Sequence, residues 1–181
     1  YGILNGTSNF ILTKMLTTEK NFNEILKEAQ KLGYAEADPT FDIDGIDTAH
    51  KLSILSSLAF NVDSELHRIK TEGIRNIDLL DLKFADSLGY KIKLLGISEI
   101  ENRVIKNYVY PCLVEKDNFI ANVDGVYNGV VVESDFCNKS FFQGEGAGSF
   151  PTATSVFSDI KSILDSEPSH LKRPKNNNVR F

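Results

Sequence analysis

The feature that most constrains the fold of this chain is a change in the spacing of its apolar residues near residue 90. Before that point, apolar residues recur three and four positions apart over residues 21–32 and 44–60, which is the spacing of amphipathic helices. After it, Tyr90, Ile92 and Leu94 alternate with lysines, which is the two-residue period of a strand. Helices that precede a block of strands predict an α+β fold and not a series of alternating βαβ units.

The remaining segments extend this pattern. Asn102 and Arg103 are suited to a hairpin turn between a strand at 90–101 and a second strand at 104–110, which Pro111 should end. Further strands are expected at 126–133 and 140–143, and further helices at 10–16, 64–71, 76–88 and from Pro151 onward. We therefore expect a mixed, largely antiparallel sheet that helices cover on one face.

Length and composition narrow the class of protein. A chain of 181 residues favours one domain with a hydrophobic core. A net charge of -5 argues against a nucleic-acid partner, and the absence of an apolar run of about 20 residues argues against a membrane span. Cys112 and Cys137 lack the CxxC spacing of zinc or redox motifs, which fits a reducing cytosol and predicts a cytoplasmic protein.

An acid-rich stretch at residues 33–51 holds the strongest chemical pattern. Five acids precede its only bases, His50 and Lys51, and the last of these acids is Asp47. Asp47 and Lys51 are four residues apart, so on a helix they lie on one face and can touch. We expect that helix, at 44–60, to be mostly buried. A lysine beside a carboxylate in such a place can pass a proton near neutral pH, and the alternative is an ordinary ion pair at an exposed edge.

Two other readings of polar segments compete with this one. Asp38, Asp42, Asp44 and Asp47 could hold calcium, but their spacing does not fit an EF-hand loop, and we expect no metal site. The glycine run at 144–148 precedes a helix and could meet a phosphate or cofactor, or form a tight turn. It is not the dinucleotide fingerprint, because Ser149 takes the place of the third glycine.

Three segments, in the same order, resemble homoserine dehydrogenase: GILNGTSNFILTKM, EAQKLGYAEADPTFDIDGIDTAHKLSIL and GEGAGSFPTATSVFSDI. The resemblance covers nearly the whole chain up to about Ile163. It implies reduction of aspartate 4-semialdehyde to L-homoserine with NADPH or NADH, on the route to threonine, methionine and isoleucine. It also implies that residues 1–165 are the catalytic, homodimer-forming domain, and that 166–181 are a linker or tail.

The chain starts without Met and with a motif in its first few residues, so we expect a piece of a longer protein. The resemblance implies a cofactor-binding Rossmann domain that these residues do not contain, and hence a fragment inactive on its own. The alternative is a non-catalytic dimerisation or binding module derived from the same family. A GxGxxG motif after a first strand, upstream of Tyr1, would favour the enzyme.

The resemblance also assigns roles to individual residues. Lys51 matches the proton donor, and Asp47 matches the acid that binds the substrate and orients that lysine. Glu36 matches the acid that contacts the amino group of homoserine, and Thr7 and Tyr34 match positions that line the substrate pocket. The positions expected close to the cofactor are Gly33, Glu36, Gly146 and Gly148.

Two residues depart from the family pattern. His50 stands where the family usually has Arg, and Phe41 where a smaller residue is common. Neither position carries a chemical role in the family, so the predicted function is unchanged.

Overall fold

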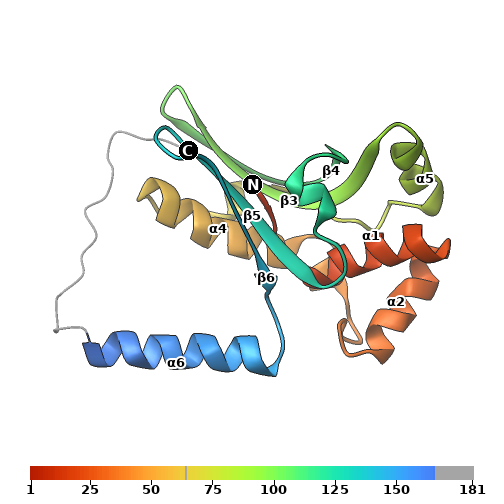
Figure 1. Ribbon diagram of the computed structural model, residues 1–181, viewed down its shortest axis with the longest axis horizontal. Coiled ribbons are helices and arrows are strands. Elements are labelled where there is room, and N and C mark those ends of the chain that lie inside the picture. The colour runs from red at the N-terminus through yellow and green to blue at the C-terminus, as the bar shows by residue number, and fades with distance from the viewer. Residues whose placement is uncertain (64, 166–181) are drawn as a thin grey trace.

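The computed structural model describes residues 1–63 and 65–165, and it has the expected α+β architecture around one six-stranded sheet (Figure 1). The strand order is β2-β4-β3-β1-β5-β6. Neighbouring strands are antiparallel except β2, which runs parallel to β4, so the sheet is mixed and largely antiparallel as predicted. The strands are β1 (Gly2–Ile3), β2 (Lys70–Thr71), β3 (Tyr90–Glu101), β4 (Val104–Glu115), β5 (Tyr127–Ser134) and β6 (Asn138–Glu145).

Helices pack on one face of this sheet, which confirms the predicted layering (Figure 1). Side chains of α1, α4 and α5 form the main core with Leu94 of β3 and Val109 of β4. The other face carries a smaller apolar cluster, to which the short 3-10 helix η2 contributes. The helical elements are α1 (Gly6–Thr18), α2 (Phe22–Lys31), α3 (Thr40–Ile43), α4 (Ile46–Phe60), η1 (Leu66–Arg68), α5 (Leu79–Ser87), η2 (Phe119–Asn122) and α6 (Ser149–Asp165).

The central strand β1 is an element that the sequence analysis did not predict. Gly2 pairs with β3 on one side, Gly2 and Ile3 pair with β5 on the other, and both residues are buried. A Cβ atom on Gly2 would lie 2.7 Å from the backbone oxygen of Gly129, so only glycine allows this close approach. Strand β1 therefore fixes Leu4 and Asn5, which follow it directly, at the middle of the sheet.

Three predicted boundaries were wrong. Strand β4 continues through Pro111 to Glu115 because its outer neighbour β2 pairs only with Tyr108 and Val109, so the missing N–H of the proline leaves no ladder bond unmade there. The segment at 64–71 is not a helix: the 3-10 turn η1 is followed by β2. Helix α5 starts after Asp78 and not at the predicted residue 76, because Asp78 forms a capping box with Asp81.

A buried lysine ties three elements of the fold together. The side chain of Lys93 on β3 is only 2% exposed, and its Nζ donates to Asn9 Oδ1 of α1 at 3.0 Å, to Val123 O at 2.7 Å and to Asp124 Oδ1 at 2.8 Å. Burial lowers the pKa of this ammonium, and the hydrogen bond to Asp124 opposes that shift. These bonds hold α1 at a set position across the sheet.

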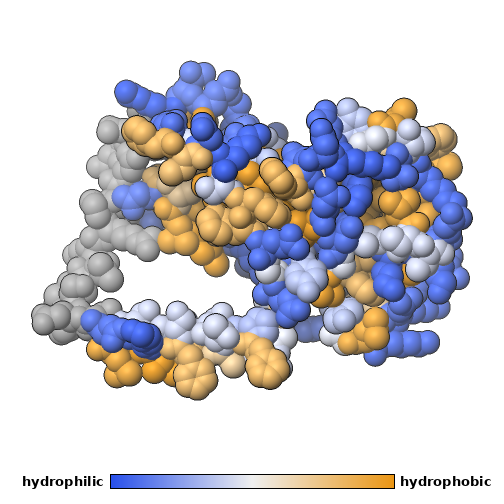
Figure 2. All heavy atoms as spheres, in the orientation of Figure 1, coloured by the Kyte–Doolittle hydropathy of each residue, from blue (hydrophilic) through white to orange (hydrophobic). Residues whose placement is uncertain are grey.

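Helix α6 forms where it was predicted, but none of its residues is buried. Its apolar side chains form a row along the outer side of the helix (Figure 2). The exposed members are Phe150, Val156, Phe157, Ile160, Ile163 and Leu164. Within the described residues, no helix is both long and apolar enough to span a bilayer. The predicted linker at 166–181 lies outside the described residues.

Candidate active site

Asp47 and Lys51 form the ion pair that their spacing predicted, at the start of α4. Lys51 Nζ donates to Asp47 Oδ2 at 2.7 Å and to the backbone oxygen of Leu4 at 3.0 Å. Asp47 lies in the first turn of α4, where the helix dipole and unpaired N–H groups favour a carboxylate. The helix begins after Gly45, which is in the left-handed conformation with φ 80°.

The pair is more open to solvent than predicted. The Lys51 side chain is 46% exposed and that of Asp47 is 18% exposed. Helix α4 buries only one side, through Thr48, Ala49, Leu52 and Ser56, and leaves Ile54, Leu55 and Leu58 exposed. The expectation of a mostly buried helix was therefore wrong, because the sheet covers one stripe of α4. The ammonium stands at the rim of the core, where a small molecule can reach it.

Asn5 is a member of this site that was not among the predicted site residues. Its Oδ1 accepts from the backbone N–H of Ser8 at 2.8 Å and so caps α1. Its Nδ2 donates to Asp42 Oδ1 at 2.7 Å and to Asp47 Oδ2 at 2.8 Å. Asn5 and Asp42 thus join the pair, although no sequence spacing connects them with Lys51.

Thr7 and Tyr34, which were predicted to line the substrate pocket, contact each other. Thr7 is two residues beyond Asn5, and its Oγ1 donates to the backbone oxygen of Tyr34 at 2.6 Å. The Tyr34 ring meets Phe10 edge to face, with 5.0 Å between ring centroids. Glu36 is exposed, and its carboxylate has no hydrogen bond or ion pair within the described residues. It is an unpaired acid close in the chain to this pocket.

The other acids of the 33–51 stretch have structural partners. Asp44 receives two hydrogen bonds from the guanidinium of Arg75, at 2.9 and 3.0 Å. Asp38 accepts hydrogen bonds from Thr40, which hold the pKa of this carboxyl below its usual value. Among the residues that the structure describes, no group of three or more His, Cys, Asp or Glu side chains is placed to hold a metal ion.

The glycines predicted near a cofactor fit that role to different degrees. Gly33 follows α2 in the left-handed conformation with φ 76°, which is common for a glycine after a helix end, and a Cβ there would meet nothing within 4 Å. Its backbone is exposed. At Gly146 a Cβ would lie 1.8 Å from Asn128 Nδ2, so the neighbouring side chain already explains this glycine. Gly148 has φ 122° at the start of α6, a conformation that other residues rarely adopt.

The two departures from the family pattern contact each other. The rings of Phe41 and His50 lie 5.3 Å apart between centroids, and both residues are exposed. They form an aromatic pair on the outside of α3 and α4. The bonds of Lys51 and Asp47 to Leu4, to Asn5 and to each other involve neither of these two side chains.

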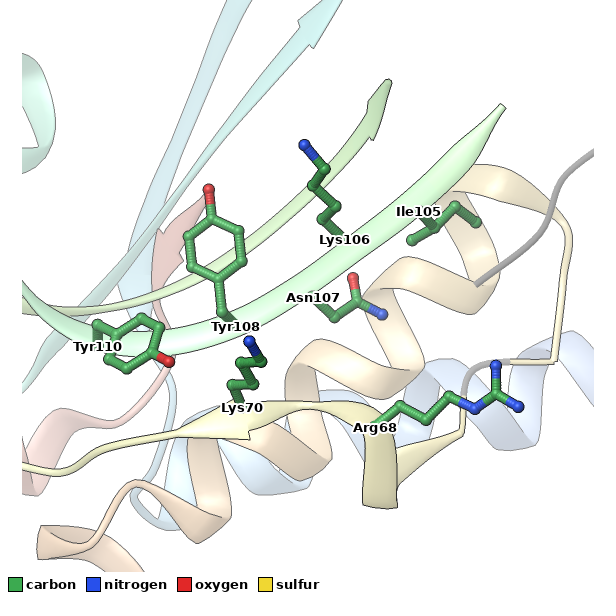
Figure 3. A pocket seen from close by; sticks show the side chains of 7 residues that line it. All are labelled: Arg68, Lys70, Ile105, Lys106, Asn107, Tyr108 and Tyr110. Carbon is green, nitrogen blue, oxygen red and sulfur yellow. The ribbon is translucent and has the colours of Figure 1, made fainter. Parts of the chain in front are cut away.

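A cavity elsewhere on the molecule is not the candidate site. It lies on the outer part of β4, beside β2 and η1 (Figure 3). Two of its cations are already paired, Lys106 with Glu101 and Arg68 with Glu65, and it contains no residue of the predicted site. The lining residues are Arg68, Lys70, Ile105, Lys106, Asn107, Tyr108 and Tyr110.

Comparison with known proteins agrees with the resemblance seen in the sequence. The family model described as homoserine dehydrogenase matches residues 1–160. A homoserine dehydrogenase of Neisseria gonorrhoeae is 48% identical over 162 residues, which cover 90% of this chain and 37% of that protein. The counterpart in Bacillus subtilis is 44% identical over 163 residues, covering 90% of this chain and 38% of that protein.

Solved structures show the same likeness. The crystal structure of a homoserine dehydrogenase from Thiobacillus denitrificans has a TM-score of 0.90 and 48% identity, and covers 96% of this chain and 41% of that one. A hyperthermophilic archaeal homoserine dehydrogenase in complex with NADPH has a TM-score of 0.74 and 30% identity, and covers 92% of this chain and 47% of that one. The chain thus spans about two fifths of the length of these relatives.

Proposed function

Since this chain belongs to the homoserine dehydrogenase family, we propose that residues 1–165 are the catalytic domain of an oxidoreductase that reduces L-aspartate 4-semialdehyde to L-homoserine with NADPH or NADH. The single observation that carries this proposal is the Lys51–Asp47 pair. The Lys51 side chain is about half exposed, and Leu4 and Asn5 hold the pair at the rim of the core. Such a fixed, accessible ammonium suits the transfer of one proton.

Lys51 is the proposed proton donor. A bound nicotinamide supplies the hydride, and the carbonyl oxygen of the semialdehyde then needs a proton. Two of the three N–H groups of Lys51 are directed to Leu4 O and Asp47 Oδ2, which leaves the third for the substrate oxygen. The ammonium stabilises the developing negative charge and then donates the proton from Nζ. Asp47 keeps the lysine in this orientation.

Glu36 and Asp47 are the proposed partners of the substrate ammonium. A free carboxylate such as that of Glu36 binds an ammonium without first breaking an ion pair of its own. Thr7 and Tyr34, joined by their hydrogen bond, would form the wall of the pocket beside Asn5. The backbone of Gly33 and the start of α6 at Gly148 would lie along the cofactor, with Glu36 near both ligands. Gly146 is less strongly supported as a cofactor contact, because the close approach of the Asn128 side chain is a separate reason for a glycine there.

We propose that the rest of the full-length protein supplies a cofactor-binding domain. The share of the relatives that this chain spans, 37–38%, supports this, as does the exposed apolar row of α6, which needs an apolar partner to leave water. Residues 1–165 alone would then be inactive. The free cysteines Cys112 and Cys137 agree with a cytoplasmic location for the enzyme.

We also propose a homodimer. Among the described elements, only η2 adds a helix to the sheet face opposite α1 and α4, and Phe119 on it remains 72% exposed. Light scattering on the full-length protein should give twice the mass of one chain. A mass of one chain at micromolar concentration would exclude the dimer.

The proposed activity is tested by following NADPH or NADH oxidation by the full-length protein in the presence of aspartate 4-semialdehyde. We expect semialdehyde-dependent oxidation with homoserine as the product, identified by mass spectrometry. Absence of turnover with both cofactors, in a folded sample that still forms dimers, would favour a non-catalytic dimerisation module instead.

A further inference from the structure

We propose that Asn5 is a positioning residue for the proton-transfer pair, one that holds Asp47 where it can orient Lys51; this inference rests on the proposed function. Asn5 does not contact Lys51 itself. It acts through Asp47 Oδ2, the atom that accepts both Asn5 Nδ2 and Lys51 Nζ. The side chain is 5% exposed, so water has little access to replace it.

The orientation of the Asn5 amide is determined by its own hydrogen bonds. Oδ1 must face the backbone N–H of Ser8, since that N–H is a donor and cannot bond to the NH2 group. The NH2 group therefore points to the carboxylates, and each of its two hydrogens has an acceptor, Asp42 Oδ1 and Asp47 Oδ2. Both hydrogens of the amide NH2 group and one lone pair of Oδ1 are thus engaged in hydrogen bonds. The capping of α1 and the placement of Asp47 depend on the same amide.

The amide also separates two like charges. Asp42 on α3 and Asp47 on α4 both approach Asn5 Nδ2, within 2.7 and 2.8 Å, so the two carboxylates share one donor group. Two anions that meet at one point repel each other, and the two amide hydrogens offset this repulsion by bonding one carboxylate each. Among the described residues, Asp42 of α3 and Asp47 of α4 bond to this amide, and Lys51 of α4 is linked to it through Asp47. The β1–α1 connection contributes only neutral groups, and the neighbouring His50 faces Phe41.

Adjacent residues of one connection position both members of the pair. The backbone oxygen of Leu4 accepts from Lys51, and the side chain of Asn5 donates to Asp47. Both residues follow β1, which is paired on both sides at the centre of the sheet. The rigid sheet thereby sets the distance between the ammonium and the rest of the pocket.

Asn5→Asp separates the two roles of this residue in the full-length enzyme. Aspartate is as good a helix cap as asparagine, so α1 keeps its cap. The substitution replaces the NH2 donor group by an oxygen of a third carboxylate, which faces those of Asp42 and Asp47. The added negative charge should move the alkaline limb of the kcat–pH profile to higher pH, because a nearby negative charge favours the protonated form of an ammonium. Misplacement of Asp47 should lower kcat at neutral pH by about 10²-fold.

Asn21→Asp is the matched control, because Asn21 caps α2 with the same bond geometry and is remote from the pair. Its pH profile and kcat should equal those of the wild type. If Asn5→Asp does not fold, as judged by circular dichroism, Asn5→Ser keeps a capping oxygen and loses the paired donors, and it should show the same drop in kcat. A profile and kcat like wild type in the folded variant would overturn the positioning role. Failure of the proposed function would appear separately, as a wild-type enzyme with no semialdehyde-dependent turnover.

Discussion

Replacing Lys51 with Met in the full-length protein should lower kcat for semialdehyde reduction by about 10²–10⁴-fold, the usual contribution of a positioned general acid. Methionine keeps much of the length of the lysine stem but has no proton to give. The exposed position of Lys51 means that the change should cost little stability, because its ion pair is a surface pair worth at most about 1 kcal/mol. The measurement is steady-state kcat with both substrates saturating.

Lys70→Met is the control for this loss. Lys70 is also exposed, and it lines the cavity beside β4, which contains no residue of the predicted site. Its replacement removes the same charge from the same protein and should leave kcat within about twofold of the wild type, since surface charges far from the reaction act only through the screened field. Equal losses in the two variants would point to net charge and not to a proton donor.

Gly73→Ala should destabilise the protein by about 3 kcal/mol, the upper end of the usual cost of overpacking. A Cβ at this position would lie 2.0 Å from Ile43 O and 2.3 Å from Asp44 Cα. Both are backbone atoms, so no side chain can rotate away to relieve the clash. The same contact includes the hydrogen bond from Ile74 N to Ile43 O at 2.7 Å. At this chain length, the melting temperature should fall by roughly 6–12 °C.

Gly144→Ala is the matched control for stability, because a Cβ on Gly144 would meet nothing within 4 Å. Its melting temperature should change by no more than about 2 °C, which corresponds to a surface substitution. The Gly73 clash falls on the α3–α4 junction that carries Asp42 and leads to Asp47, so Gly73→Ala should also lower kcat. A melting temperature equal to that of the wild type would contradict this prediction. It would mean that the backbone of the α3–α4 junction can shift enough to admit the extra methyl group.

The parts of the fold that the sequence predicted are those set by local patterns. Alternation at 90–101 gives β3, and the apolar spacing over 21–32 gives α2, which begins with a capping box of Asn21 and Glu24. Strand β1 could not be predicted because two residues contain no period. Its presence depends on the strands on either side, and the only local hint is Gly2, where a side chain would not fit.

The candidate site, too, has one part that local sequence patterns predict and another part that they do not. The Lys51–Asp47 contact follows from helical spacing, because four residues on a helix place two side chains together. The second role of Asn5 does not, since it joins residues 37 and 42 positions apart in the chain. The bond between Asp44 and Arg75 spans 31 positions, which is why an acid-rich stretch resembled a metal site until its partners were known.

The exposure of the pair also depended on the tertiary structure. The apolar residues of α4 occur on more than one side of the helix, which predicted a buried helix. The sheet covers only one side, and Ile54 on another is 61% exposed. Position relative to the sheet, which helical spacing does not contain, therefore decides that Lys51 is accessible to a substrate.

The central claim is that Lys51 stabilises the negative charge that develops on the carbonyl oxygen during hydride transfer and gives that oxygen its proton. A single-turnover measurement on Lys51→Met, with cofactor and semialdehyde both saturating, tests it most directly because slow product release does not mask the chemical step. We predict nicotinamide oxidation slowed by at least about 10²-fold, with the Kd for homoserine within a few-fold of wild type. Nicotinamide oxidation at the wild-type rate would contradict this role for Lys51.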